Sequence, residues 1–362
     1  ISEMGTDGDV LFDALAPRVA YNANTNEWIV VWEADDDHSG LVNGESEAYA
    51  QWIDSTGALV ENGNTRLSDM GEVDGSTAYN AFSVAVASAG PNGSFVVWQG
   101  DDDFTGILSD DEYEIYGQRV STNNVEVGTN DERLSDMGPD GDEHFDANTP
   151  AIAYNSVNNE YLVVWSGDDL GVGLADGEFE IVGQRIDAST GAEIGADDFR
   201  ISDMGPNGDS LFDAVNPAVA YNAANNEYLV VWQGEDDSLI DGEFEIFGQR
   251  IAGGTGAEVG ANDFRISDMG PDGDSAYDAQ NPAVAFNPVT QEYLVVWEGD
   301  DSTLPLVDND FEIFGQRLVA ATGAEVGEND FRISDMGTDG DGLHDAERPA
   351  VAANTLTGEY LV

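Results

Sequence analysis

Short apolar runs separated by turn residues predict β-strands along the whole chain. In one representative segment, residues 160–165 are aromatic and β-branched and are apolar on both faces. We therefore expect the sheet that contains this run to be covered on both sides. Turns at 155–159 and 187–191 help to separate four predicted strands, at 150–154, 160–165, 178–186 and 199–202.

The same pattern recurs every 65 to 67 residues, each time from an Arg-Ile/Leu-Ser-Asp-Met-Gly segment. These segments begin at Arg66, Arg133, Arg200, Arg265 and Arg332, and the chain opens on a partial copy. The repeats are 1–65, 66–132, 133–199, 200–264, 265–331 and the partial 332–362.

A unit of four antiparallel strands that is apolar on both faces predicts an all-β fold, a β-propeller with one blade of about 66 residues per repeat. We expect one domain, 1–362, of six blades, with seven as the alternative. The terminal blade would be shared between the N- and C-termini, with residues 1–4 as its outer strand. A jelly roll or paired sandwich is the other candidate, but a strict repeat favours radial stacking. Because the chain starts and stops inside repeats, we expect it to belong to a longer protein.

Composition excludes several classes of function. The chain has 73 acidic residues, only 11 basic ones and a formal net charge of −62, and all the basic residues are arginines. This balance argues against nucleic acid and against anionic membrane surfaces. The absence of cysteine excludes disulfides, thiolate zinc sites and thiol catalysis. No apolar run approaches ~18 residues, so we expect no membrane insertion.

Aspartates follow the fourth predicted strand at spacings of four, two and four residues around glycine. Ca²⁺ takes about six to eight oxygen ligands, whereas Mg²⁺ demands a stricter octahedron. We therefore predict calcium at this Asp-Gly-Asp loop, about one ion or more per blade. The alternative is a metal-free turn held by side-chain hydrogen bonds. The predicted ligands are Asp7, Asp9, Asp13, Asp136, Asp140, Asp142, Asp146, Asp203, Asp209, Asp213, Asp268, Asp272, Asp274, Asp278, Asp335, Asp339, Asp341 and Asp345.

The second copy departs from this frame, with Ser76 and Asn80 where other copies have aspartate. We expect its site to be weaker or empty. A second acidic loop joins the second and third predicted strands, and alternation of strand direction places it on the same face as the Asp-Gly-Asp loop. It is a further candidate metal loop, with a solvated acidic surface as the alternative. Its candidate ligands are Asp168, Asp169, Asp236, Asp237, Asp300 and Asp301.

The remaining polar residues give no catalytic set. Most arginines fall in Gly-Gln-Arg or Phe-Arg-Ile-Ser frames, which predicts structural hydrogen bonds between strands or blades. The three histidines, His38, His144 and His344, lie at non-equivalent or variable loop positions. We therefore assign no catalytic residue and no organic cofactor.

The frame Pro-Ala-Val-Ala, Tyr-Leu-Val-Val-Trp, Glu-Ile-Phe-Gly-Gln-Arg and Phe-Arg-Ile-Ser resembles tandem repeats of large secreted bacterial surface proteins. The Asp-rich loops are loosely similar to the calcium loops of FG-GAP propellers in integrin α chains, although the register of the acids differs. The resemblance covers the whole chain. It implies a secreted, calcium-dependent propeller with an extracellular or cell-surface location.

We therefore predict a calcium-stabilised, non-enzymatic module for adhesion, ligand binding or matrix building, with a glycan or protein ligand. One alternative is a polysaccharide-acting enzyme, a lyase or hydrolase. An enzyme would break its repeat symmetry to build a site, and departures such as Trp52 in place of arginine concentrate in the first two repeats. Another alternative is a filament or array subunit, self-assembling through its incomplete terminal blade. The acidic, lysine-free composition also fits a marine or halophilic source.

Overall fold

The computed structural model describes residues 1–362 except 3, 5–11, 37–40, 61–62, 72–74, 103–107, 110, 170–172, 237–238, 241, 303–305, 307–309, 339 and 341–342. The described residues are built almost entirely from strands and turns, with one short 3₁₀ turn, η1 (Gly90–Asn92). In this part of the chain no helix has the length and apolar character needed to cross a membrane.

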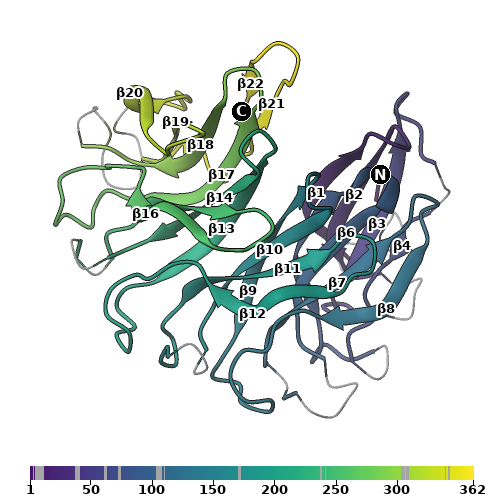
Figure 1. Cartoon of the computed structure of the whole chain (residues 1–362). Helices are drawn as coiled ribbons and strands as arrows, with labels where there is room; N and C mark the ends of the chain where they lie inside the picture. Colours follow the sequence, from purple (N-terminus) through teal and green to yellow (C-terminus); the bar gives the residue numbers. More distant parts are fainter. Residues whose placement is uncertain are drawn as a thin grey trace. The chain divides into compact units, whose positions relative to one another are not determined.

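Five four-stranded antiparallel sheets follow one another along the chain, and we call each a blade (Figure 1). The first blade has β1 (Ala14–Asn22), β2 (Glu27–Ala34), β3 (Glu47–Asp54) and β4 (Thr65–Arg66). The second has β5 (Ala81–Ser88), β6 (Ser94–Gly100), β7 (Glu114–Val120) and β8 (Glu126–Arg133). The third has β9 (Ala147–Asn155), β10 (Glu160–Gly167), β11 (Glu180–Asp187) and β12 (Glu193–Arg200).

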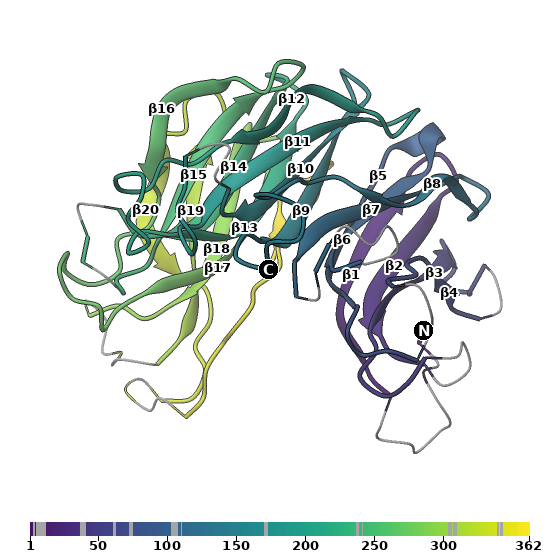
Figure 2. The same ribbon diagram turned by 90° about the horizontal axis from the view of Figure 1, so that it is seen from below.

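The fourth blade has β13 (Ala214–Asn222), β14 (Glu227–Gly234), β15 (Glu245–Ala252) and β16 (Glu258–Arg265). The fifth has β17 (Ala279–Asn287), β18 (Glu292–Gly299), β19 (Glu312–Val319) and β20 (Glu325–Arg332). Within each blade the strands are hydrogen-bonded in chain order, and Figure 2 shows this order from a second side. The all-β propeller fold predicted from the repeats is confirmed.

The predicted number of six blades is wrong, because the last repeat forms only a small two-stranded sheet of β21 (Ala352–Ala353) and β22 (Tyr360–Leu361). In the described chain there are five complete blades. The predicted outer strand at residues 1–4 is also not formed, since the described residues Ile1, Ser2 and Met4 lie in no strand. Met4 instead packs against Trp32 of the first blade.

The second strand is buried on both faces in the second to fifth blades, as its apolar pattern predicts, whereas Trp28 of β2 in the first blade is 43% exposed. In β10, five consecutive residues from Tyr161 to Trp165 are at most 1% exposed. In the fourth and fifth blades, Val231 of β14 packs in one cluster with Trp297 of β18. Val31 of β2 and Trp98 of β6 make the same kind of cluster in the first two blades. Facing sheets therefore bury each other's second strands.

The predicted fourth strand is displaced in the structure. The sequence pattern placed it at residues 199–202, whereas β12 spans Glu193–Arg200. Most of β12 is exposed, so it lacks the apolar residues that mark a buried strand.

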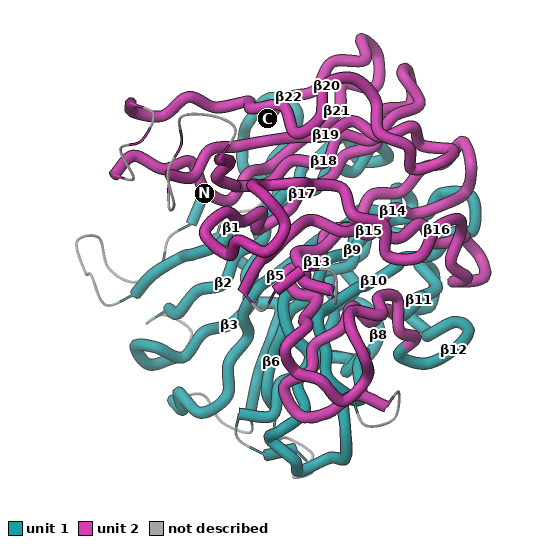
Figure 3. The backbone as a smooth tube through the Cα atoms, turned by 90° about the vertical axis from the view of Figure 1, so that its left-hand side faces the viewer, with its two compact units in different colours: residues 1–172, 184–198 teal, residues 173–183, 199–362 magenta. Residues whose placement is uncertain are grey.

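The chain divides into two compact units, shown in different colours in Figure 3. One unit contains residues 1–172 and 184–198, and the other contains residues 173–183 and 199–362. The acidic loops occur in both units. The pocket described below lies wholly in the first.

Candidate functional site

The first two aspartates of the Asp-Gly-Asp loop are held by the arginine that ends the fourth strand. Arg265 contacts Asp268 through Nη2 at 2.9 Å and Asp272 through Nη1 at 2.7 Å. Its Nη2 also lies 2.5 Å from Oε1 of the buried Glu245. Corresponding ion pairs join Arg66 to Asp69, Arg133 to Asp136 and Asp140, Arg200 to Asp203, and Arg332 to Asp335. A guanidinium therefore neutralises carboxylates that the sequence assigned to calcium.

A buried glutamate at the start of the third strand completes this arrangement. Glu245 accepts the Met269 N–H at 2.8 Å and the Ser267 hydroxyl. Burial raises the pKa of Glu245 to about 8, against the lowering effect of Arg265. Burial likewise raises the pKa to about 8 in Glu47 and Glu114 and to about 7 in Glu180. These glutamates anchor the chain where it leaves the fourth strand.

The fourth aspartate of the frame meets the second acidic loop. Asp146 donates its N–H to Oδ1 of Asp168 at 2.7 Å and accepts the Tyr113 N–H at 3.0 Å. Burial, and then the charges of Asp168 and Glu112, raise the pKa of Asp146 to about 6. The same N–H to carboxylate bond joins Asp278 to Asp300 and Asp13 to Asp35. The two acidic loops of the sequence prediction are therefore side by side within each of these blades.

The third aspartate of the frame stays within its own loop. Asp142 bonds the ring Nδ1 of the exposed His144 at 2.7 Å. Asp274 accepts the Ala276 N–H at 3.3 Å. The acids of one frame are thus divided among different partners, with the first two sharing one arginine. The described residues contain no group of three or more acidic or histidine side chains placed to hold a metal. Five predicted ligands lie outside the described residues: Asp7, Asp9, Asp237, Asp339 and Asp341.

The second copy, in which Asn80 replaces the fourth aspartate, keeps the same contacts. The Asn80 N–H donates to Oδ1 of Asp101 at 2.9 Å, and its side-chain oxygen accepts the Ser46 N–H at 2.9 Å. An uncharged amide therefore serves this structural role as well as a carboxylate does. The weaker metal site predicted here stays a prediction.

Glycine in the Asp-Gly-Asp motif binds a glutamate of the second loop. The Gly141 N–H donates to both carboxylate oxygens of Glu112, at 3.0 and 2.9 Å. Gly208 makes one such bond, at 2.7 Å, to Oε2 of Glu178. Glu178 is fully buried, and its Oε1 has no hydrogen-bond partner among the described residues. This oxygen is unsatisfied in a place where burial of a carboxylate is costly.

An aspartate near the end of the fourth strand was missed by the sequence prediction. Asp198 is 8% exposed, has a φ of +41°, and accepts the Asp136 N–H at 3.0 Å through Oδ2. Its buried Oδ1 has no partner among the described residues. Burial, and then the charge of Asp197, raise the pKa of Asp198 to about 7. The equivalent residues Asp131, Asp263 and Asp330 each accept a backbone N–H through Oδ2 and have a buried Oδ1 with no partner among the described residues. Burial raises the pKa of each to about 7. The available signal was an Asp-x-Arg spacing in these repeats.

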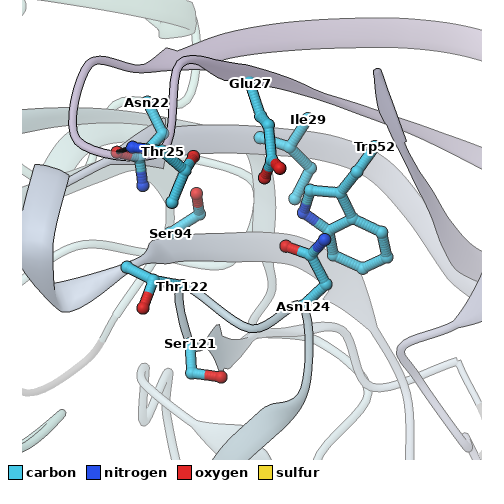
Figure 4. A pocket seen from close by; sticks show the side chains of 9 residues that line it. All are labelled: Asn22, Thr25, Glu27, Ile29, Trp52, Ser94, Ser121, Thr122 and Asn124. Atoms are coloured by element: carbon cyan, nitrogen blue, oxygen red, sulfur yellow. Dashed lines mark hydrogen bonds between the residues drawn. The ribbon is translucent and has the colours of Figure 1, made fainter. Parts of the chain in front are cut away.

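A pocket lies between the first and second blades, away from the acidic loops (Figure 4). Its cavity volume is about 10 Å³, room for about one water molecule, and the rest of the hollow is open to solvent. The carboxylate of Glu27 and the amide of Asn124 point toward the indole of Trp52 (Figure 4). The lining residues are Asn22, Thr25, Glu27, Ile29, Trp52, Ser94, Ser121, Thr122 and Asn124. One aromatic, one carboxylate, two amides and four hydroxyls therefore surround one space.

The pocket forms where the repeats lose their symmetry. Trp52 pairs with Ile29 across β2 and β3, at the position that Arg250 holds opposite Leu229 in the fourth blade. Ser94 of β6 stands at the position of a fully buried tyrosine, such as Tyr228 of β14. Replacement of a large ring by a serine removes side-chain volume from this side of the pocket.

Comparisons with known proteins support the fold. No protein-family model matches the chain, and no curated protein matches it either. A solved α-L-arabinanase from Penicillium chrysogenum, complexed with arabinobiose, has a TM-score of 0.51 at 10% identity, covering 95% of this chain and 86% of that one. An α-L-arabinofuranosidase from Fusarium graminearum has a TM-score of 0.47 at 12% identity, covering 95% and 86%. An N-acetylgalactosamine deacetylase from F. plautii has a TM-score of 0.47 at 13% identity, covering 82% and 83%.

The prediction of a non-enzymatic adhesion, binding or matrix module is corrected by the match to the arabinanase, a carbohydrate-acting enzyme with a TM-score of 0.51. The prediction took the regular repeats as evidence for a scaffold. Trp52, at which the repeat is broken, lines the pocket.

Proposed function

We propose that this propeller is a polysaccharide-acting hydrolase, with a sugar bound at the mouth of the pocket lined by Glu27 and Trp52. The observation that carries the proposal is the composition of this pocket at a place where two blades depart from their repeat. Sugar rings combine hydroxyl groups with apolar C–H faces. Hydroxyl and amide side chains around the pocket match the first.

Glu27 is the carboxylate of this pocket, and we assign it proton transfer to the glycosidic oxygen. Glycoside hydrolysis ordinarily relies on carboxyl groups as general acid, base or nucleophile. Asn124, which points toward the same space, would hold a sugar hydroxyl beside it. The indole of Trp52 is 4% exposed and forms the wall that keeps water from one side of Glu27.

The fold supports the proposal at the level of the scaffold. The Penicillium chrysogenum arabinanase, with a TM-score of 0.51, has arabinobiose bound. A propeller can therefore carry a carbohydrate site. A fold by itself does not determine which reaction a protein catalyses, so the proposal of hydrolysis depends on the side chains of the pocket.

We also propose that calcium binds the acidic loops at their buried carboxylates. Support comes from Asp168, which is 1% exposed beside Asp146, and from the unpartnered oxygen of Glu178. Ionised carboxylates removed from water need a cation, a proton or donors. Calcium would supply charge neutralisation and stability there. A location outside the cell is the matching proposal, since extracellular modules bind calcium at about 10⁻⁴–10⁻³ M.

Release of reducing sugar from a panel of neutral and amine-bearing polysaccharides tests the enzymatic proposal. The native chain should hydrolyse at least one polymer, and Glu27→Gln should lose about 100-fold or more of that activity. Glu292→Gln is the matched control, because Glu292 is the equivalent residue of the fifth blade and pairs with Arg317. No hydrolysis of any polymer, or full activity in Glu27→Gln, would overturn the proposal.

A further inference from the structure

Asn207 stands in the fourth repeat where the neighbouring repeats have an aspartate. The equivalent residues of the third and fifth repeats are Asp140 and Asp272, and an arginine binds each of them at 2.7 Å. Asn207 keeps this contact, because Nη1 of Arg200 donates to its side-chain oxygen at 2.8 Å. The guanidinium therefore binds an uncharged amide at a position where other repeats have a carboxylate.

The residue after Asn207 is a glycine, and the backbone nitrogen of a glycine can attack the side-chain amide of a preceding asparagine. Glycine favours this attack because it has no Cβ to block the approach. A Cβ built on Gly208 would meet nothing within 4 Å, so the space around this residue is open. Asn207 and Gly208 are both exposed, and water therefore reaches the pair.

A buried carboxylate binds the backbone N–H that such an attack must remove. The Gly208 N–H donates to Oε2 of Glu178 at 2.7 Å, and the same oxygen accepts the Ala175 N–H at 2.8 Å. Glu178 is fully buried, and its Oε1 has no partner among the described residues. A carboxylate within hydrogen-bond distance of an N–H is placed to accept its proton.

Arg200 binds the other reacting group, the side-chain amide of Asn207. A guanidinium N–H at the amide oxygen stabilises the negative charge that develops there when the carbonyl carbon becomes tetrahedral. Arg200 is itself fixed by ion pairs with Asp203 and the buried Glu180. Among the described residues nothing accepts a hydrogen bond from Nδ2 of Asn207, so no contact holds the leaving nitrogen.

We infer that Asn207 is a self-modification site, which the backbone nitrogen of Gly208 converts to an acidic residue. The bond from this nitrogen to Cγ of Asn207 forms while Glu178 accepts the proton of the nitrogen. The Cγ–Nδ2 bond then breaks, and the proton leaves with Nδ2 as ammonia. Water adds to the resulting cyclic imide and breaks one of its C–N bonds, which gives aspartate or isoaspartate.

The aspartate product restores the acid of the neighbouring repeats. Arg200 then has the ion pair that Arg133 makes with Asp140. The calcium proposed above would use Oε1 of Glu178, whereas this reaction uses Oε2, which already binds the Gly208 N–H. The inference is independent of the proposed hydrolysis of polysaccharides.

Two other Asn-Gly pairs in the described chain lack part of this arrangement and are internal controls. The Gly44 N–H donates to Oδ2 of Asp35 at 2.8 Å, but no arginine of the described chain contacts the exposed Asn43. At Asn92 the amide nitrogen donates to another side chain at 2.6 Å, and the Gly93 N–H bonds a backbone carbonyl. Asn43 thus has the carboxylate without the guanidinium, and Asn92 has neither.

The test measures the conversion of each Asn-Gly pair by peptide mass spectrometry while the native chain is incubated near neutral pH. Conversion replaces an amide by a carboxylate and changes the mass of the peptide. In the folded chain Asn207 should convert about tenfold or more faster than Asn43. In urea the two rates should become similar, because both pairs are then solvated and have no fixed neighbours.

Glu178→Gln should slow the conversion of Asn207 about tenfold or more, because glutamine keeps an oxygen for the Gly208 N–H but does not accept its proton. Glu112→Gln is the matched control, since Glu112 makes the equivalent bond to Gly141, and it should leave the rate at Asn207 unchanged. Circular dichroism establishes that each variant is folded. If Glu178→Gln does not fold, the comparison of folded and urea-treated native chain decides.

Three results would overturn the inference. One is an equal rate at Asn207 and Asn43 in the folded chain. Another is a faster rate at Asn207 that persists unchanged in urea, because the local sequence alone would then explain it. The third is a native rate of conversion in folded Glu178→Gln.

Discussion

Arg185 of β11 and Glu160 of β10 form a buried ion pair, with 2.7 Å between Nη2 and Oε2. Their side chains are 7% and 2% exposed. In the first blade the same two positions are held by Trp52 and Glu27, which line a pocket. One pair of positions is therefore a structural contact in one blade and a solvent-accessible site in another.

Arg185→Ala should lower the free energy of unfolding by about 3–5 kcal/mol, because it leaves the charge of Glu160 buried without its partner. Urea unfolding followed by tryptophan fluorescence measures this loss. Arg18→Ala is the control, since Arg18 is exposed and donates to the Pro17 carbonyl at the surface, so its loss should cost about 0.5 kcal/mol or less. Equal losses in the two variants would show that the burial of the Arg185 pair has no energetic consequence.

Gly205→Ala should destabilise the fold more than Gly208→Ala, although both glycines have a positive φ in one loop. A Cβ on Gly205, at φ +63°, would lie 2.5 Å from the ring of Phe212. A Cβ on Gly208, at φ +91°, would meet nothing within 4 Å. Both variants carry the backbone strain of about 1 kcal/mol, and only the first adds a clash. Thermal unfolding of the two proteins compares them, and a lower midpoint for Gly208→Ala would contradict the packing shown here.

Lowering the pH from about 9 to about 6 should raise the thermal midpoint in the absence of metal. Burial raises the pKa of Glu114 to about 8, against an ordinary value of 4.5, so the folded state holds this proton more tightly than the unfolded state. The penalty for its charge is complete above the folded pKa and is relieved as the pH falls through that value. Glu47 and Glu245 add to the effect. Calorimetric scans measure the midpoint, and a steady fall toward pH 6 would refute the prediction.

Asp198→Asn should stabilise the metal-free protein at about pH 8 by about 1 kcal/mol or more, because it removes a buried charge without a counter-ion. The amide keeps one oxygen to accept the Asp136 N–H. Asp197→Asn is the neighbouring control, since Asp197 is exposed and its charge is screened by water. Denaturant midpoints rank the two variants, and a destabilised Asp198→Asn would mean that its carboxylate makes a contact that an amide cannot replace.

Calcium at about 10 mM should raise the thermal midpoint relative to an EDTA-treated sample, since an ion bound to the folded state alone stabilises it by mass action. Magnesium at the same concentration is the control for ionic strength and should do less. A titration with sodium chloride at fixed calcium shows how much of the change in thermal midpoint comes from screening of the net charge of −62 rather than from calcium binding. An identical thermal midpoint with calcium and with EDTA would show that calcium does not stabilise this protein.

The sequence by itself determined the repeat, the four-stranded blade and the burial of the second strand on both faces. These features depend on local patterns, such as residues 161–165, whose alternate side chains are all apolar and all buried. It also placed the two acidic loops on one face, because strand direction alternates along the chain. Asp146 and Asp168 meet as that rule requires.

Only the tertiary structure decided which partners the acids have. Asp136 and Asp140 are bound by Arg133, whereas Asp146 faces Asp168. Spacing along the chain had suggested that one cation gathers all of these carboxylates. The spacing alone does not reveal that an arginine binds these carboxylates. The chain bends after the fourth strand, and this bend brings the guanidinium and the carboxylates together.

The start of the fourth strand and the burial of Asp198 likewise depended on the tertiary structure. An exposed edge strand shows no apolar period, and the burial of Asp198 depends on a contact with Asp136, 62 residues earlier in the chain. The pocket has the same origin. Trp52 stands out in the sequence as a departure from the repeat, but it lines a cavity with Ser94 only because two neighbouring sheets bring one substituted position against another. Packing between blades, rather than pattern within them, determines this site.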